Sequence, residues 1–81
     1  MKVTVNRLDK TIVDGKCVVN FLIEEGDSAF AIEKQITLVD GKSNESYTKE
    51  AYALSEDEID AWKEEVSTNG REFDPVSGTF A

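Results

Sequence analysis

Apolar and polar residues alternate along the first forty positions in a pattern that predicts a β-meander. Two turn signals divide this stretch, an Asp-Gly pair at 14–15 and a Gly-Asp pair at 26–27, and such pairs are typical of two-residue hairpins. The first turn then pairs Val13 with Lys16. Both hairpins place the same set of residues on one face, which is what a correct register must do. That predicted buried face contains Leu8, Ile12, Cys17, Val19, Phe21, Ile23, Phe30, Ile32, Ile36 and Leu38.

One part of the first strand does not fit this alternation. Val3 and Val5 have the opposite parity to Leu8, so a regular strand would place them on the other face of the sheet. An extra residue in one strand reverses the parity of everything beyond it. We therefore expect a bulge or a break near Asn6 and Arg7.

The segment after the polar loop at 40–46 fits two secondary structures. Tyr47, Ala51 and Leu54 have the spacing of a helical stripe. Thr48 and Tyr52, together with Tyr47, instead favour a strand. We expect a fourth strand over 47–54, and the helical alternative stays open.

A helix is predicted over 56–68. Ser55 and Glu58 have the spacing of a capping box, in which each side chain accepts from the other residue's backbone N–H, and Asn69-Gly70 supplies a stop signal. The stripe that would cover the sheet consists of Ile59, Trp62 and Val66. The predicted fold is thus α+β, an antiparallel three- or four-stranded β-meander with one C-terminal helix packed on one face, in a single domain over 1–70.

Two groups of apolar residues remain without an assigned place in that core. Residues 71–81 form a C-terminal tail that either docks on the body as a short strand or stays loose. The sheet face turned away from the helix also carries apolar side chains, and the tail or a partner subunit would cover them. The candidate partner-binding residues from these two places are Val18, Leu22, Ala31, Phe73, Val76 and Phe80.

Few side chains that carry chemistry are present. The chain has no His, the commonest general base and transition-metal ligand, and Cys17 is its one thiol, on the predicted buried face where a thiol is inert. Gly41-Lys42-Ser43 resembles the end of a phosphate-binding loop but lacks the glycine five positions earlier, so it is interpreted as a turn. We predict no catalytic, cofactor-binding or metal-binding residues, and therefore no enzyme.

Net charge narrows the classes of partner. The chain has 17 acids, nine bases and a formal charge of −8, which disfavours direct binding of nucleic acid or of an anionic membrane and favours a basic protein. Asp57, Asp60 and Glu64 form a candidate acidic surface on the predicted helix. Its carboxylates have roughly half the density of the phosphates on duplex DNA.

These features together predict a small protein that works by binding. No leader or membrane segment is evident, and the lone thiol forms no internal disulfide, so we expect the protein in the cytoplasm. In size and charge the chain resembles small acidic accessory proteins of phages and bacteria. Our leading hypothesis is a non-enzymatic protein-binding or assembly module, in which homo-oligomers form through the second sheet face or the tail. The alternative is an acidic nucleic-acid mimic that inhibits a DNA- or RNA-binding protein.

Overall fold

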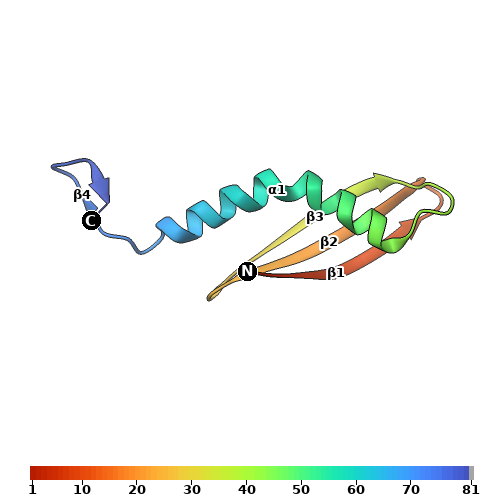
Figure 1. The fold of residues 1–81 in the computed structure, drawn as a ribbon, viewed down its shortest axis with the longest axis horizontal. Coiled ribbons are helices and arrows are strands. Elements are labelled where there is room, and N and C mark those ends of the chain that lie inside the picture. The colour runs from red at the N-terminus through yellow and green to blue at the C-terminus, as the bar shows by residue number, and fades with distance from the viewer. Residues whose placement is uncertain (81) are drawn as a thin grey trace.

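A three-stranded antiparallel sheet and one long helix form the body of the protein (Figure 1). The computed structural model describes residues 1–80, so Ala81, the last residue of the predicted tail, lies outside the described residues. The sheet has the order β1-β2-β3, and a separate two-stranded hairpin follows the helix. The α+β meander is confirmed, with three strands in the main sheet. The elements are β1 (Lys2–Thr11), β2 (Lys16–Glu25), β3 (Ser28–Thr37), α1 (Asn44–Thr68), β4 (Phe73–Asp74) and β5 (Thr79–Phe80).

The hairpin between β2 and β3 has the predicted register. Glu25 pairs with Ser28 across the turn, and Phe21 therefore lies opposite Ile32. Gly26 has φ of +58°, a left-handed conformation that glycine adopts without a steric cost. The turn chemistry alone was enough to fix this register.

The hairpin between β1 and β2 differs from the prediction. Lys16 pairs with Thr11, not with Val13, and residues 12–15 form a longer loop. A two-residue Asp-Gly turn needs positive φ at both positions, but among the described residues only glycines have positive φ, so Asp14 does not adopt it. Ile12, predicted on the buried face, is in consequence 84% exposed.

The bulge in β1 is confirmed. The ladder between β1 and β2 shifts register between Val5 and Arg7. Val5 lies opposite Phe21, a buried residue of the core, so Val3 and Val5 share the face of Leu8 in spite of their opposite parity. The bulge thus turns every large apolar residue of β1 to the side of the sheet that carries the helix.

The helix is twice as long as predicted, because the structure has helix over 47–54 where we expected a fourth strand. Helix α1 begins at Asn44, and Ser43 is its N-cap, whose side-chain oxygen accepts from the backbone N–H of Ser46 at 3.1 Å. This bond satisfies one of the backbone donors that a helix start leaves without a partner. The end of the helix is as predicted, with Asn69 at the C-cap and positive φ at Gly70.

Ser55 is a buried residue inside the helix, and the predicted capping box with Glu58 is therefore wrong. The Ser55 hydroxyl donates to the carbonyl oxygen of Ala51 at 2.7 Å, so its one strong donor has a partner in the same helix. A small polar residue can occupy the core in this way at low cost. The buried stripe recurs every four residues: Tyr47, Ala51, Ser55 and Ile59.

The core lies between this stripe and the inner faces of β2 and β3. The helix packs mainly on these two strands and much less on β1. Cys17 is fully buried as predicted, and burial raises the pKa of its thiol. Trp62 lies at the edge of the core and stacks on Phe30, with the ring centres 5.6 Å apart. The buried apolar residues are Cys17, Val19, Phe21, Ile23, Ile32, Ile36, Tyr47, Ala51 and Ile59.

Polar contacts, two of which follow, connect the helix to the sheet and to the loop before it. The ammonium of Lys34, on the apolar side of β3, lies 2.5 Å from the carboxylate of Glu58 on α1. The Tyr47 hydroxyl donates to the carbonyl of Val39 at 2.9 Å and accepts from the N–H of the same residue at 2.8 Å. Both contacts fix where the helix lies over the sheet.

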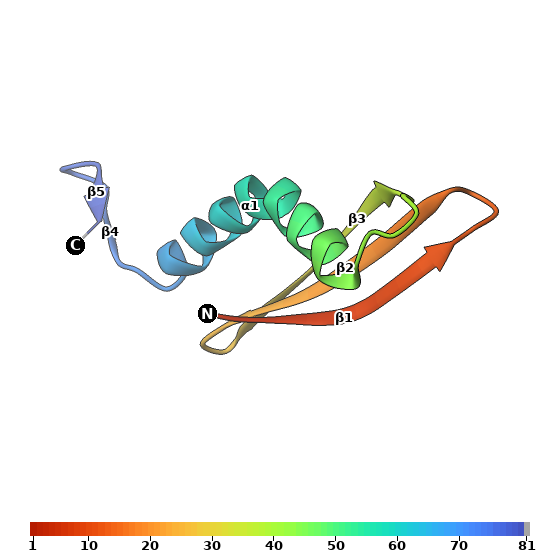
Figure 2. The same cartoon turned by 45° about the vertical axis from the view of Figure 1, so that its right-hand side comes forward.

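The tail forms a hairpin of its own. Strands β4 and β5 pair antiparallel, with Phe73 opposite Phe80. Figure 2 places this hairpin beyond the C-terminal end of α1, away from the three-stranded sheet. Within one chain the tail is therefore not a strand docked on the second sheet face. The molecule is elongated in consequence, with extents of 58 × 20 × 18 Å.

Candidate protein-binding surfaces

The tail hairpin presents two aromatic rings to solvent. Phe73 and Phe80 meet edge to face with ring centres 5.7 Å apart, yet they are 55% and 42% exposed. The guanidinium of Arg71 lies 4.6 Å from the centre of the Phe80 ring, in a cation–π contact. Large aromatic side chains at this exposure are typical of binding surfaces.

The turn of this hairpin is held by the aspartate that opens it. Asp74 accepts from the backbone N–H of Val76 at 2.9 Å, and its own carbonyl accepts from Gly78. The bond from Val76 holds the pKa of the Asp74 carboxyl below its ordinary value. Val76 projects from the turn and is 95% exposed. The hairpin therefore has a defined shape with an apolar tip and an aromatic base.

A second apolar surface lies where β1 is left uncovered. A shallow groove of about 530 Å³ runs between β1 and the first turns of α1, and we call it the β1–α1 groove. Its apolar floor comes from Val5, which is 44% exposed, and from Leu8. The helix side contributes Asn44, Glu45, Thr48 and Lys49.

The prediction from sequence did not include this groove. The only signal for it was the misfit of Val3 and Val5, which located the bulge but not the open face above it. That face is open because α1 packs over β2 and β3. The position of a helix across a sheet depends on tertiary packing, which periodicity does not report.

The residues predicted on the far sheet face form a smaller patch. Leu22 lies directly opposite Ala31, and both face away from the core residues of β2 and β3. Val18, on the same face, has Asp9 on one side and Gln35 on the other. The structure does not bring this patch together with the tail hairpin, which lies beyond the C-terminal end of α1 (Figure 1).

The acidic surface has the predicted position on the helix. Asp57, Asp60 and Glu64 are all exposed on α1. Charges of the opposite sign are found on β1, which carries Lys2, Arg7 and Lys10 against one acid. The chain is thus polarised, with a basic edge strand and an acidic helix.

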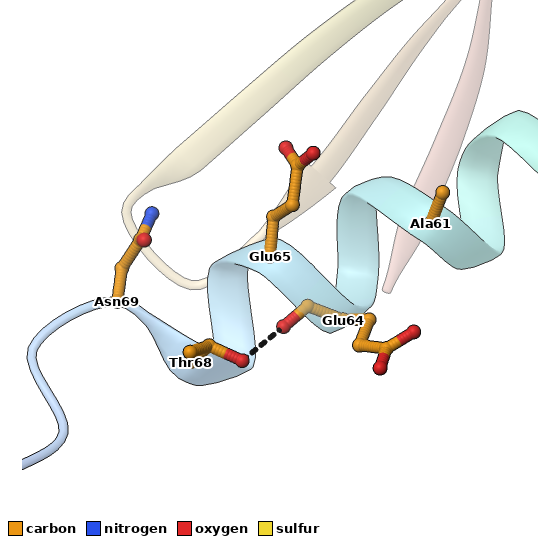
Figure 3. A pocket seen from close by; sticks show the side chains of 5 residues that line it. All are labelled: Ala61, Glu64, Glu65, Thr68 and Asn69. Atoms are coloured by element: carbon orange, nitrogen blue, oxygen red, sulfur yellow. Dashed lines mark hydrogen bonds between the residues drawn. The ribbon is translucent and has the colours of Figure 1, made fainter. Parts of the chain in front are cut away.

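The concave surface near the end of α1 does not assemble an acid–base pair. A hollow there is lined by Ala61, Glu64, Glu65, Thr68 and Asn69, and the two carboxylates point to different sides of the helix (Figure 3). The Thr68 hydroxyl donates to the backbone carbonyl of Glu64 at 2.8 Å, not to a carboxylate. Within residues 1–80, no cluster of three His, Cys, Asp or Glu side chains is placed to hold a metal ion.

The chain exposes more surface than a compact protein of its mass. Its accessible surface is 5770 Å², whereas a folded monomer of 9.0 kDa is expected to expose about 4,900 Å². The radius of gyration is 17.1 Å, compared with about 12 Å for a compact domain of this length. The excess is about 900 Å², and the hairpin lies beyond the end of α1, away from the sheet (Figure 2).

Two further findings bear on function. Over the part of the chain that the structure describes, α1 is the one helix, and it carries too many charges to span a bilayer. Comparisons with models of protein families, with curated proteins and with solved structures found no match.

Proposed function

We propose that this chain is a non-enzymatic, acidic protein-binding or assembly module, active in the cytoplasm as an accessory protein of a phage or bacterium. One observation carries the proposal: the chain leaves about 900 Å² more surface in water than its mass requires. A specific protein interface covers about 800 Å² on each partner. The excess is therefore enough for one complete interface.

The tail hairpin is the part of this surface best suited to binding. Phe73 and Phe80 are each about half exposed, so covering either ring is worth roughly half of the about 1.5–3 kcal/mol that full burial of such a side chain gives. The rings are already held against each other, and the turn at Asp74 is closed by hydrogen bonds. A preformed segment loses less conformational entropy when it binds, which leaves more of the burial energy for affinity.

Charge supports a second candidate function, an acidic nucleic-acid mimic that inhibits a DNA- or RNA-binding protein. The observation in its favour is the exposed row of Asp57, Asp60 and Glu64 on a helix of 25 residues. Such a mimic would bind through screened charges, so its affinity would fall steeply as salt is raised. An interface formed by Phe73 and Phe80 would lose little affinity as salt is raised.

A capture experiment with matched variants tests the proposal. Tagged wild-type protein is incubated with lysate of the organism that encodes it, beside Phe73→Ser/Phe80→Ser and a control, Ile12→Ser/Val13→Ser. The control removes two apolar side chains that are more exposed than the two rings, at 84% and 97%, and that lie in the loop between β1 and β2. We expect one protein to be retained by wild type and control at high salt and lost from the Phe variant.

The opposite pattern supports the nucleic-acid mimic. In that case the Phe variant keeps its partner, and high salt releases it. Asp57→Asn/Asp60→Asn/Glu64→Gln would then abolish capture without loss of the fold, since these side chains are exposed. That result would contradict the module proposed here.

A further inference from the structure

We infer that the Asn69-Gly70 pair, at the junction between α1 and the tail hairpin, is a site of spontaneous covalent modification. There the asparagine is converted into a mixture of aspartate and isoaspartate. The inference goes beyond the proposed function and does not depend on it. The reaction joins an asparagine side chain to the backbone nitrogen of the next residue, so both groups must be accessible.

The side-chain amide of Asn69 is the electrophile. Asn69 is the C-cap of α1 and is exposed, and Figure 3 shows its amide projecting from the end of the helix. The Thr68 hydroxyl beside it donates to the carbonyl of Glu64, whereas the Asn69 amide has no hydrogen-bond partner within residues 1–80. No contact with another polar group therefore holds this amide in place.

The backbone nitrogen of Gly70 is the nucleophile. The N–H groups of the residues on either side both donate to backbone carbonyls of α1, but within the described chain the Gly70 N–H donates to no acceptor. Glycine has no side chain to obstruct the approach of its nitrogen. The space beside it is also open, since a Cβ built on Gly70 would meet no atom within 4 Å.

A single hydrogen bond closes the turn that contains this pair. Asn69 has φ −60° and ψ 130°, and Gly70 has φ +82°, as in a type II turn. The Arg71 N–H closes the turn by donating to the Thr68 carbonyl at 3.1 Å. At this ψ the Gly70 nitrogen is turned away from the Asn69 side chain, so the reaction needs a rotation that opens the turn. Exposed turns at helix ends open at little cost in free energy.

The reaction needs no partner except water. A base removes the proton of the Gly70 nitrogen, which attacks Cγ of Asn69, and the amide nitrogen takes up a proton and leaves as ammonia. The product is a five-membered succinimide, in which this nitrogen is bonded to both carbonyl carbons of residue 69. Water that attacks Cγ opens the ring to aspartate. Water that attacks the backbone carbonyl carbon leaves the main chain running through Cβ and Cγ, which is isoaspartate.

The other three asparagines of the chain lack this combination of features. Asn6 and Asn20 lie in paired strands, and their side chains share a hydrogen bond of 3.3 Å. Asn44 is the first residue of α1 and precedes a glutamate. None of the three precedes a glycine. They are therefore internal controls for the reaction at Asn69.

The modification changes the junction that carries the tail hairpin. Both products add a negative charge at the C-terminal end of α1, where the helix dipole is negative and the last turn has no basic residue. Isoaspartate also adds a carbon atom to the main chain between Thr68 and Arg71, so the bond between these two residues no longer closes a turn of normal length. We expect the isoaspartate form to lose the turn and the aspartate form to keep it.

Peptide mapping by mass spectrometry tests the modification. The full chain is incubated in mildly alkaline buffer beside Asn69→Gln, whose longer side chain would have to close a six-membered ring. Trypsin cleaves after Lys63 and Arg71, and the fragment 64–71 contains one asparagine and no aspartate. We expect this fragment to give two products, both deamidated, while the Gln variant and the fragments with the other asparagines stay intact. Equal deamidation of all four asparagines, or aspartate without isoaspartate, would overturn the inference.

Hydrogen exchange at the Arg71 amide tests the effect on the turn. Anion-exchange chromatography separates the modified protein from its parent, because the modified protein carries one more negative charge. Asn69→Asp is the matched control, since it adds the charge without lengthening the main chain. We expect the Arg71 amide to exchange faster in the isoaspartate form than in the parent or in this control. Equal exchange in all three would mean that the turn survives and that the inferred change at the junction is wrong.

Discussion

The start of α1 can be tested by placing an aspartate at either of two serines. Ser43 is the exposed N-cap, whereas Ser55 is fully buried in the middle of the helix. Aspartate is as good an N-cap as serine, and its charge is favourable near the positive end of the helix dipole. Ser43→Asp should therefore leave the stability unchanged or raise it by up to about 1 kcal/mol.

The same substitution at Ser55 should have the opposite effect. An ionised carboxylate at this position would be shielded from water, since Ser55 is 0% exposed. An uncompensated buried charge costs about 3–5 kcal/mol, and a domain of 81 residues is stable by about 4–12 kcal/mol in total. Ser55→Asp should therefore unfold much of the population.

Urea denaturation followed by Trp62 fluorescence and far-ultraviolet circular dichroism measures both effects. Ser55→Ala is the control for the site, and it should change the stability by only about 0.5 kcal/mol, since the lost hydrogen bond is offset by the helix propensity of alanine. If Ser55→Asp keeps the wild-type midpoint while Ser43→Asp lowers it, the helix begins at Ser55 and the structure described here is wrong in this region.

Two other contacts have measurable consequences. Tyr47→Phe should lower the free energy of unfolding by about 1–3 kcal/mol, because the hydroxyl bonds both the N–H and the carbonyl of Val39. Tyr52→Phe breaks no hydrogen bond found within residues 1–80 and should cost less. Equal costs for the two variants would refute this. The pKa of Asp74 is lowered from 3.8, so its bond to Val76 is fully formed above that pH and is lost as pH falls through the lowered pKa. The Val76 amide shift in NMR should follow that titration, and a shift independent of pH would contradict it.

Local chemistry was enough to predict several parts of this fold. The turn at Gly26 fixed the register of β2 and β3, and Gly70 marked the end of the helix. The parity of Val3 and Val5 located the bulge in β1. In each case the signal depends on residues close together in the sequence, and no distant contact opposes it.

Two predictions that rested on a single local motif were wrong. The spacing of Ser55 and Glu58 matches a capping box, but Ser55 lies on the buried stripe, where packing against the sheet extends the helix in both directions. The Asp14-Gly15 pair matches a tight turn, but the chain forms a longer loop that leaves Ile12 in solvent. Cap and turn motifs are common in sequences, so such a motif predicts structure only where the pattern of buried residues around it is consistent with it.

The exposed apolar surfaces were predicted in part. Sequence alone indicated that Phe73, Val76 and Phe80 lie beyond the helix, and the structure places them in one exposed hairpin. It did not indicate the β1–α1 groove, because that surface exists only where α1 leaves β1 uncovered. A surface between two elements depends on their relative position, which no motif in either element encodes.

Small-angle X-ray scattering tests most directly whether the chain leaves apolar surface for another protein to cover. The measurement is made on Phe73→Ser/Phe80→Ser and on wild type, at concentrations where light scattering reports a monomer. For both we expect a radius of gyration near the 17.1 Å of the structure, with the hairpin away from the sheet. A wild-type value near about 12 Å would mean that the hairpin folds back and covers its own chain, and no surplus surface would then remain for a partner.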